Sequence, residues 1–253
     1  MVWQNYTKES DMKQISEGVF YIAGQDEFIP DSHVYVIGKP SSGDLTLVDA
    51  GLMGKGAYKV EAIQKLGLSL SDIKRVIMTH THLDHIGCVK EILNEIPHAK
   101  LWVHTKEAEP LEQGDERIVY GMDMFKSMCQ GQYNIKKDAF KFEIDRKLDG
   151  GETLKMGDMT WEVIHIPGHS QGSIALYNRS GKILIPGDVV YADYAIGRFD
   201  LHGANGPALR DSLLTLGELE VDILLPGHNR IMEDVQPGYI VETANQWGPY
   251  LNQ

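Results

Sequence analysis

Histidine and aspartate side chains in this sequence have the types and the spacing needed to bind metal ions. Residues 79–85 read Thr-His-Thr-His-Leu-Asp-His and carry four nitrogen or oxygen donors within six residues. On an extended segment His80, His82 and Asp84 project to one side, and a turn into a following helix can bring His85 around to them. Protonated histidines at this spacing repel one another, whereas neutral histidines are good ligands for a divalent cation. The segment therefore predicts a metal site.

Three further candidate ligands come directly after apolar segments that end in Pro-Gly. They are His169, Asp188 and His228. A Pro-Gly pair ends a strand and turns the backbone sharply, so the next side chain points across the edge of the sheet. Ligand sites gather outside the carboxyl ends of strands, and we therefore expect all seven side chains to share one edge. The donor set contains no thiolate, which fits zinc and also iron or manganese.

Short apolar runs rich in β-branched residues predict the strands that position these ligands. We expect strands at residues 19–23, 34–38, 45–49, 75–79, 100–103, 161–166, 174–177, 182–185 and 222–225. Helical patterns lie at residues 56–66, 87–96, 207–219 and 239–247. Both halves of the chain begin with consecutive strands and end with alternating strands and helices. Each half can therefore supply one sheet of an α/β sandwich with helices outside.

Composition places limits on the partners of the protein. Its 253 residues include 24 basic and 36 acidic side chains, a net charge of −12, which disfavours nucleic acid and anionic membranes as partners. The two cysteines, Cys88 and Cys129, are too few for a disulfide framework and suit a reducing compartment. The first residues lack the apolar segment of a signal peptide, so we expect a cytoplasmic protein with a small-molecule substrate. No linker or repeat divides the sequence, and one domain over residues 1–253 is expected.

Five histidines lie outside the pattern of strand-end ligands. They are His33, His98, His104, His165 and His202. We interpret them as surface or packed residues, and we keep only His202 as a candidate pocket residue. Cys88, three residues after His85, is expected to be a buried helix residue.

The seven candidate ligands together resemble the metal-binding signature of the metallo-β-lactamase-fold hydrolases. Residues 47–51, Leu-Val-Asp-Ala-Gly, also match the first strand-turn motif of that superfamily, and the resemblance covers residues 19 to 228. It implies a four-layer αββα sandwich of two mixed sheets flanked by helices, with a binuclear site at one sheet edge. In this resemblance Asp188 bridges the two metals. The first metal is held by His80, His82 and His169, and the second by Asp84, His85 and His228.

The resemblance also implies a reaction. Two divalent ions, zinc before iron or manganese, share a hydroxide that attacks the carbonyl of a small ester, thioester or lactone, because a bound divalent ion brings the pKa of water close to 7. Asp84 is expected to orient the nucleophile and relay its proton. Asp49 is a candidate acceptor for the free N–H of a ligand histidine, although an aspartate before Gly51 also suits a turn.

Comparison with individual families of this superfamily narrows the range of possible substrates. True β-lactamases of this fold are secreted and lack a bridging aspartate at the position of Asp188. Glyoxalase II is similar over residues 187–201, but it usually continues into a helical domain, and only 25 residues follow His228 here. Lactonases of the fold place a tyrosine three positions after the bridging aspartate, as Tyr191 is here, and its phenol could donate to a developing oxyanion. Packing is the alternative interpretation of Tyr191.

The segment of residues 105–140 is longer than a connection between strands of the sheet requires, and we predict that it forms a helical lid insertion. Met122, Phe125 and the pair Met128 and Cys129 fall at helical spacing and form an apolar stripe that could bind an acyl chain. A helix packed on its own sheet is the competing interpretation.

Three other functions stay open at this point. One is an iron-dependent oxidoreductase similar to the persulfide dioxygenases, which would bind a single iron and consume oxygen. Another is a phosphodiesterase or nuclease of the same superfamily, which the net charge of −12 disfavours. The last is a noncatalytic binding protein, in which we would expect some ligands to be missing. The oligomeric state is not indicated by the sequence.

Overall fold

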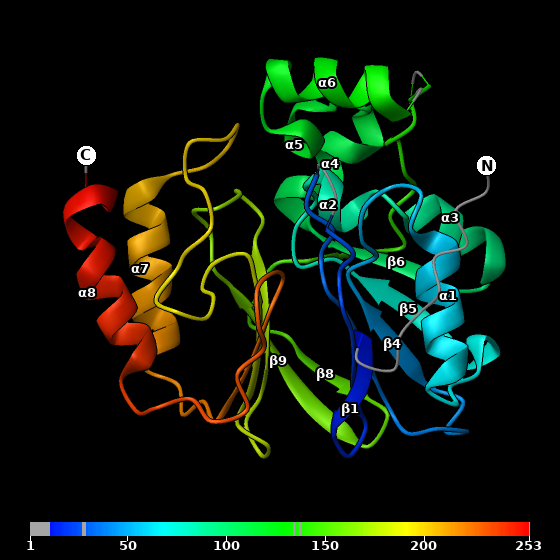
Figure 1. Cartoon of the computed structure of the whole chain (residues 1–253), viewed down its shortest axis with the longest axis horizontal. Helices are drawn as coiled ribbons and strands as arrows, with labels where there is room; N and C mark the ends of the chain where they lie inside the picture. The colour runs from blue at the N-terminus through cyan, green and yellow to red at the C-terminus, as the bar shows by residue number, and fades with distance from the viewer. Residues whose placement is uncertain (1–10, 27–28, 134, 137, 253) are drawn as a thin grey trace.

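Two β-sheets pack face to face, and helices cover both outer faces (Figure 1). This computed structural model describes residues 11–26, 29–133, 135–136 and 138–252. The expected four-layer αββα sandwich of two mixed sheets is confirmed. As predicted, the first half of the chain builds one sheet and the second half builds the other.

The first sheet contains seven strands in chain order. Strands β1 to β4 pair antiparallel, and β4 to β7 pair parallel. Their bounds are β1 Met12–Ser16, β2 Val19–Ile22, β3 Val34–Ile37, β4 Leu45–Val48, β5 Ile73–Ile77, β6 Lys100–His104 and β7 Arg146–Leu148. Parallel neighbours need crossover connections, and the crossovers here are helical. They are α1 Gly56–Lys65, α2 Leu83–Ile86, α3 Val89–Glu95, α4 Thr105–Gln113, α5 Arg117–Tyr120 and α6 Asp123–Tyr133.

The second sheet contains five strands in the order β12-β11-β10-β9-β8. All neighbours pair antiparallel except β11 and β12, which are parallel. The strands are β8 Thr153–Met156, β9 Met159–His165, β10 Ile174–Asn178, β11 Ile183–Gly187 and β12 Ile223–Pro226. The outer face of this sheet is covered by α7 Gly206–Gly217 and α8 Tyr239–Leu251 (Figure 1).

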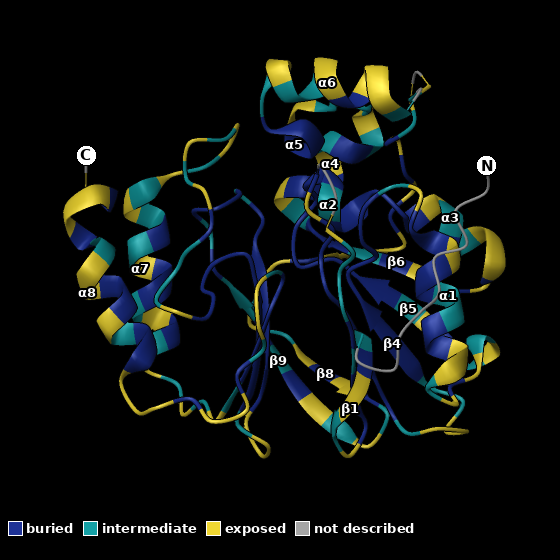
Figure 2. Ribbon diagram, viewed as in Figure 1, coloured by how far each residue is buried: buried dark blue, intermediate teal, exposed yellow. Residues whose placement is uncertain are grey.

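Three apolar clusters correspond to the three spaces between the four layers. The central one packs the two sheets together and includes Tyr35, Trp161 and Leu176, all fully buried. A second cluster lies between the first sheet and α1, α3 and α4, and a third lies between the second sheet and α7 and α8. Figure 2 shows the central strands buried, exposed residues along the edge strands β1 and β8, and exposed outer faces of the helices. The burial of both faces explains why the central strands read as continuous apolar runs.

One predicted local conformation is wrong. Asp84 was expected to continue the extended alternation of His80 and His82, but the extended segment ends at His82, which precedes the first residue of α2. Asp84 and His85 therefore lie in the first turn of a short helix. The helical turn directs them to a different point from His80 and His82, and a second ligand group results.

Three strands escaped prediction, and each has a physical reason. Strand β8 alternates exposed and buried residues, whereas β1 and β7 each bury only one residue fully, and all three strands expose lysine, arginine or glutamine. They lie at sheet edges or ends and bury little apolar surface, so their sequences carry a weak strand signal.

None of the helices in the described parts of the chain is long and apolar enough to cross a membrane.

Candidate metal centre

All seven predicted ligands meet at one edge of the sandwich, where strands from both sheets end. His80 and His82 follow β5, and Asp84 and His85 lie in α2 directly behind them. The second sheet contributes His169 after β9, Asp188 after β11 and His228 after β12. The Pro-Gly turns thus have the predicted effect, because each places its next side chain at the shared edge.

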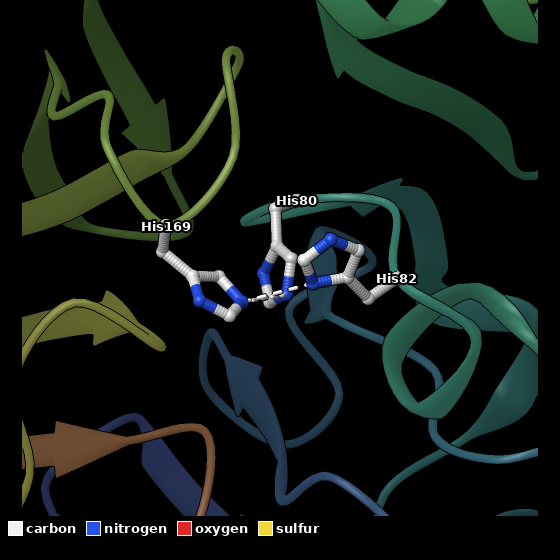
Figure 3. A group of neighbouring side chains, drawn as sticks. All are labelled: His80, His82 and His169. Carbon is white, nitrogen blue, oxygen red and sulfur yellow. Dashed lines mark hydrogen bonds between the residues drawn. The ribbon is translucent and has the colours of Figure 1, made fainter. Parts of the chain in front are cut away.

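The first ligand group consists of three histidines whose ring nitrogens converge (Figure 3). His82 Nδ1 lies 2.9 Å from His169 Nε2, and His80 Nε2 lies 3.2 Å from the same atom. Burial and the neighbouring imidazoles lower the pKa of His80 well below its usual value and that of His82 to about 3. Burial also lowers the pKa of His169. The three rings are therefore neutral, the form in which imidazole binds a metal.

The second group combines two histidines with two carboxylates: Asp84, His85, Asp188 and His228. His228 Nε2 lies 2.9 Å from Asp84 Oδ2, and His85 Nε2 lies 3.2 Å from Asp188 Oδ1. Burial acts to raise the pKa of Asp84, but the hydrogen bond from His228 and the nearby His85 outweigh it and lower the pKa. The Asp84 carboxylate is therefore ionised.

Asp188 lies between the two groups. Its Oδ2 is 3.7 Å from His169 Nε2 in the first group and 3.5 Å from His228 Nε2 in the second. A carboxylate that reaches both groups has the placement expected of a bridging ligand.

The donor atoms fit metal ions better than they fit one another. His85 Nε2 and Asp188 Oδ1 are buried and lie 3.2 Å apart without the geometry of a hydrogen bond, and neither has another hydrogen-bond partner among the described residues. Such atoms are costly to bury unless something binds them. Gly227 leaves room for both side chains beside it, since a Cβ there would lie 2.1 Å from Asp188 Oδ1 and 2.7 Å from His85 Cε1. Nitrogen and oxygen donors that converge in this way are typical of a divalent-metal site.

Contacts behind the ligands orient their rings. Asp49 Oδ2 lies 2.9 Å from His85 Nδ1, the contact expected for this residue, and Asp49 also accepts hydrogen bonds from the Thr79 backbone and hydroxyl. Its φ of 59° shows that it forms the turn as well. His169 Nδ1 lies 2.7 Å from the Arg198 carbonyl oxygen and donates its proton there, which directs Nε2 toward the metal site.

A cavity of about 340 Å³ opens onto the ligands. One wall is apolar and includes Ile29, Val119, Met122, Phe125 and Leu201, and the metal edge supplies His82, Asp84, His169, Asp188 and His228. Tyr191, Arg198 and Asn229 add polar groups to the lining. Arg198 lies in the segment of residues 187–201 that is similar to glyoxalase II, and Asn229 directly follows the last ligand, but the sequence analysis gave neither residue a role at the site.

Tyr191 lies at the position that the sequence suggested for a proton donor. Burial and the nearby Asp188 carboxylate raise the pKa of Tyr191 well above its usual value. The phenol therefore keeps its proton and can donate it as a hydrogen bond.

Some other predictions for this region need correction. The predicted apolar stripe is not one surface, because Met122 and Phe125 line the cavity, Cys129 is buried in the core and Met128 is 41% exposed. His202 is exposed and lines a separate hollow rather than the cavity at the metal edge. Cys88 is buried, as expected.

The other histidines are packed or exposed, as predicted. His33 is buried between the Gly24 N–H and the Asn229 carbonyl oxygen, and the rings of His104 and His165 stack with centroids 4.2 Å apart. His98 is exposed.

Comparison with known proteins settles the family. The sequence model described as the metallo-beta-lactamase superfamily matches residues 30–228, from the segment before β3 to the last ligand. The chain belongs to the metallo-β-lactamase superfamily. The resemblance inferred from the seven ligands is therefore confirmed, and with it the expectation of a metal-dependent hydrolase at the level of the family.

Relatives within this superfamily include bacterial and animal proteins. A probable metallo-hydrolase of Bacillus subtilis, YflN, is 29% identical over 78% of this chain and 80% of its own length. The human acyl-coenzyme A thioesterase MBLAC2 is 28% identical over 71% of this chain and 66% of its own length.

Solved structures share the fold. BJP-1, a subclass B3 metallo-β-lactamase of Bradyrhizobium japonicum, superposes with a TM-score of 0.68 at 23% identity and covers 98% of this chain and 95% of its own. A di-iron-bound form of TTHA1623 gives a TM-score of 0.62 at 24% identity over 84% of this chain and 93% of its own. At these identities the similarity shows the fold alone.

Proposed function

We propose that this protein is a binuclear hydrolase of a small thioester, with small esters and lactones as related substrates. The observation that carries the proposal is the placement of two adjoining ligand groups at one end of a cavity whose other wall is apolar. Similarity to a protein named acyl-coenzyme A thioesterase supports the choice of a thioester.

The residues that would hold the metals follow from the two groups. His80, His82 and His169 would hold one ion, Asp84, His85 and His228 the other, and Asp188 would contact both. Bound divalent ions polarise a carbonyl oxygen and lower the pKa of water. We propose zinc as the metal, with iron and manganese as alternatives that the same donors accept.

Two side chains of the cavity carry the remaining chemistry. The ionised Asp84 carboxylate lines the cavity and can accept a proton from an attacking water. The protonated Tyr191 phenol can donate a hydrogen bond to the oxygen or sulfur on which charge develops. Both side chains line the cavity, so neither has to move into it to take these roles.

The apolar wall explains why an acyl substrate suits the cavity. Met122 and Phe125 belong to the segment of residues 105–140, which we propose to be a lid that binds the acyl chain. Arg198, although paired with Asp200, is exposed at the cavity and offers a cation to an anionic leaving group. We also propose that the protein is cytoplasmic and acts on a small molecule. The net charge of −12 supports the part of the proposal that excludes nucleic acid and membranes as partners.

An activity panel on protein of known metal content tests this function. The panel contains short and long acyl thioesters, carboxylic esters, lactones, phosphodiesters and a persulfide. We expect thioesters to give the highest kcat/KM, and the rate should increase with metal content. Oxygen consumption with the persulfide, or preferred cleavage of phosphodiesters, would replace the proposal with one of the other activities of this superfamily.

A further inference from the structure

Glu107 is a buried carboxylate directly behind the metal centre. It lies in α4 and is 1% exposed, and it belongs to neither ligand group. A buried carboxylate is costly unless hydrogen bonds compensate for lost hydration. Its contacts therefore show what the fold uses it for.

One carboxylate oxygen contacts the loop that carries His169. Glu107 Oε1 accepts a hydrogen bond from the Ser170 hydroxyl, and the Gly172 backbone N–H donates to the same oxygen at 3.2 Å. Ser170 Oγ also lies 2.8 Å from Ser173 Oγ, which accepts from the Ser170 backbone N–H at 3.2 Å. Glu107 thus holds the tight turn that immediately follows the ligand.

The same carboxylate contacts the segment that carries His80 and His82. Burial raises the pKa of Glu107, and Ser170, Thr81 and Gly172 act against that rise. Thr81 is fully buried between the two ligands. Glu107 Oε2 and Thr81 Oγ1 complete no regular hydrogen bond among the described residues, so this contact is the looser of the two.

We propose that Glu107 is a positioning residue that holds the His80, His82 and His169 group in its metal-binding geometry. The two loops that carry these ligands come from different sheets, and Glu107 contacts both of them one residue away from the ligands. Through these contacts it fixes the distance between the loops, in the way that residues behind the ligands generally orient a metal site. Among the described residues no hydrogen bond joins Glu107 to the second ligand group, so we expect that group not to depend on it.

Close packing makes the position of Glu107 sensitive to its neighbour Gly172. A Cβ on Gly172 would lie 2.8 Å from Glu107 Cγ and 3.1 Å from Glu107 Cδ. Gly172→Ala therefore displaces the carboxylate while every polar group remains in the chain.

Zinc titration in two single-site backgrounds tests the proposal. His228→Ala leaves the three-histidine group complete, and His169→Ala leaves Asp84, His85, Asp188 and His228. Affinity is measured with zinc alone by competition against a chromophoric chelator. Adding Glu107→Gln should weaken zinc binding about 10- to 100-fold in the His228→Ala protein and leave it unchanged in the His169→Ala protein.

The matched control is Glu109→Gln on the same helix, because Glu109 is exposed and its replacement changes the net charge equally. It should leave zinc binding unchanged in both backgrounds. Gly172→Ala should also lower zinc affinity in the His228→Ala background alone, and Glu107→Ala should lower it more than Glu107→Gln does.

A residue that merely stabilises the fold would weaken zinc binding equally in both backgrounds, and that result would overturn the proposal. Unchanged affinity in the His228→Ala background would also overturn it. Thermal unfolding of the metal-free proteins identifies the variants that fold. If Glu107→Ala does not fold, the nearly isosteric Glu107→Gln still allows zinc affinity to be compared in the two backgrounds. No substrate enters the measurement, so its outcome is independent of the thioesterase proposal.

Discussion

Tyr191 is the side chain whose chemistry can be separated from metal binding. Its phenol lies against Asp188 and keeps its proton. We expect Tyr191→Phe to retain both metal ions and to lower kcat for thioester hydrolysis about 10- to 100-fold, equivalent to about 1.4–2.7 kcal/mol of transition-state stabilisation. Steady-state kinetics together with elemental analysis of the same sample check this.

The neighbouring Tyr194 provides the control, since its ring stacks on Tyr239 and it does not line the cavity. Tyr194→Phe should keep parental kcat. If Tyr191→Phe turned over normally with full metal content, Tyr191 would be a packing residue, which was the competing interpretation of its sequence position.

The ligands themselves should behave differently from Tyr191. His169→Ala or Asp188→Ala removes a donor that reaches into the metal site, so metal content and activity should fall together. We expect a loss of about a hundredfold or more in kcat, at least about 2.7 kcal/mol. Metal analysis and kinetics on the same preparation measure both quantities, and full metal occupancy in either variant would show that the residue is no ligand.

Among the elements, the strand ends and the support that Asp49 gives to His85 were predictable, whereas the support from Glu107 was not. The sequence indicated His169, Asp188 and His228 because Pro-Gly after an apolar run is a local signal of where a strand stops. Glu107 carries no such signal, since a glutamate in a helix is ordinarily a surface residue and its burial depends on Ser170 and Thr81 from distant parts of the chain. Strands β7 and β8 were missed for the same reason, because only their pairing partners define them.

The helices over the cavity are predicted to select the acyl chain. Met122→Ala and Phe125→Ala shorten the apolar wall and should each raise KM for long acyl thioesters about 5- to 150-fold, because each removes about 1–3 kcal/mol of apolar contact. The KM for short acyl thioesters should change little. Kinetics on a chain-length series measure this difference.

Met124 is the matched control, since it lies in the same helix α6 and is 69% exposed. Met124→Ala should not alter the chain-length profile. A profile that also stayed unchanged in Met122→Ala and Phe125→Ala would assign these helices to packing alone. Point substitutions are preferable to deletion here, because Ile118, Val119 and Cys129 are part of the core.

The start of helix α4 predicts a pH dependence of stability. His104 Nδ1 accepts a hydrogen bond from the Lys106 N–H at 3.2 Å, and burial and the stacked His165 lower the pKa of His104 to about 4. The folded protein therefore binds fewer protons than the unfolded chain, where the pKa is about 6.5. The free energy of unfolding should decrease as the pH falls from about 6.5 to about 4.

His104→Asn keeps a side-chain acceptor for the helix start and removes the titration. The variant should lose less stability over this pH range than the parent, by about 1–2 kcal/mol after allowance for solvent screening. Urea unfolding at pH 7, 5.5 and 4.5 measures the difference. Parallel pH curves for parent and variant would show that His104 does not titrate as described.

For the whole molecule, the metal centre is a connection between two sheets. The first sheet supplies His80, His82, Asp84 and His85, and the second supplies His169, Asp188 and His228. Ions that bind only the folded arrangement stabilise it, by about 2.7 kcal/mol at a concentration one hundred times Kd. Adding zinc to metal-free protein should therefore raise Tm by about 5–10 °C. A Tm that does not respond to zinc would contradict a site shared by both sheets.

We propose that these seven side chains bind two metal ions on which hydrolysis depends. The most direct test is a titration of metal-free protein with zinc, in which bound metal and the rate of thioester hydrolysis are measured in the same samples. We expect no turnover without metal, and a rate that rises until two ions are bound per chain. Undiminished hydrolysis in the metal-free protein, or a chain that binds no zinc at saturation, would contradict it.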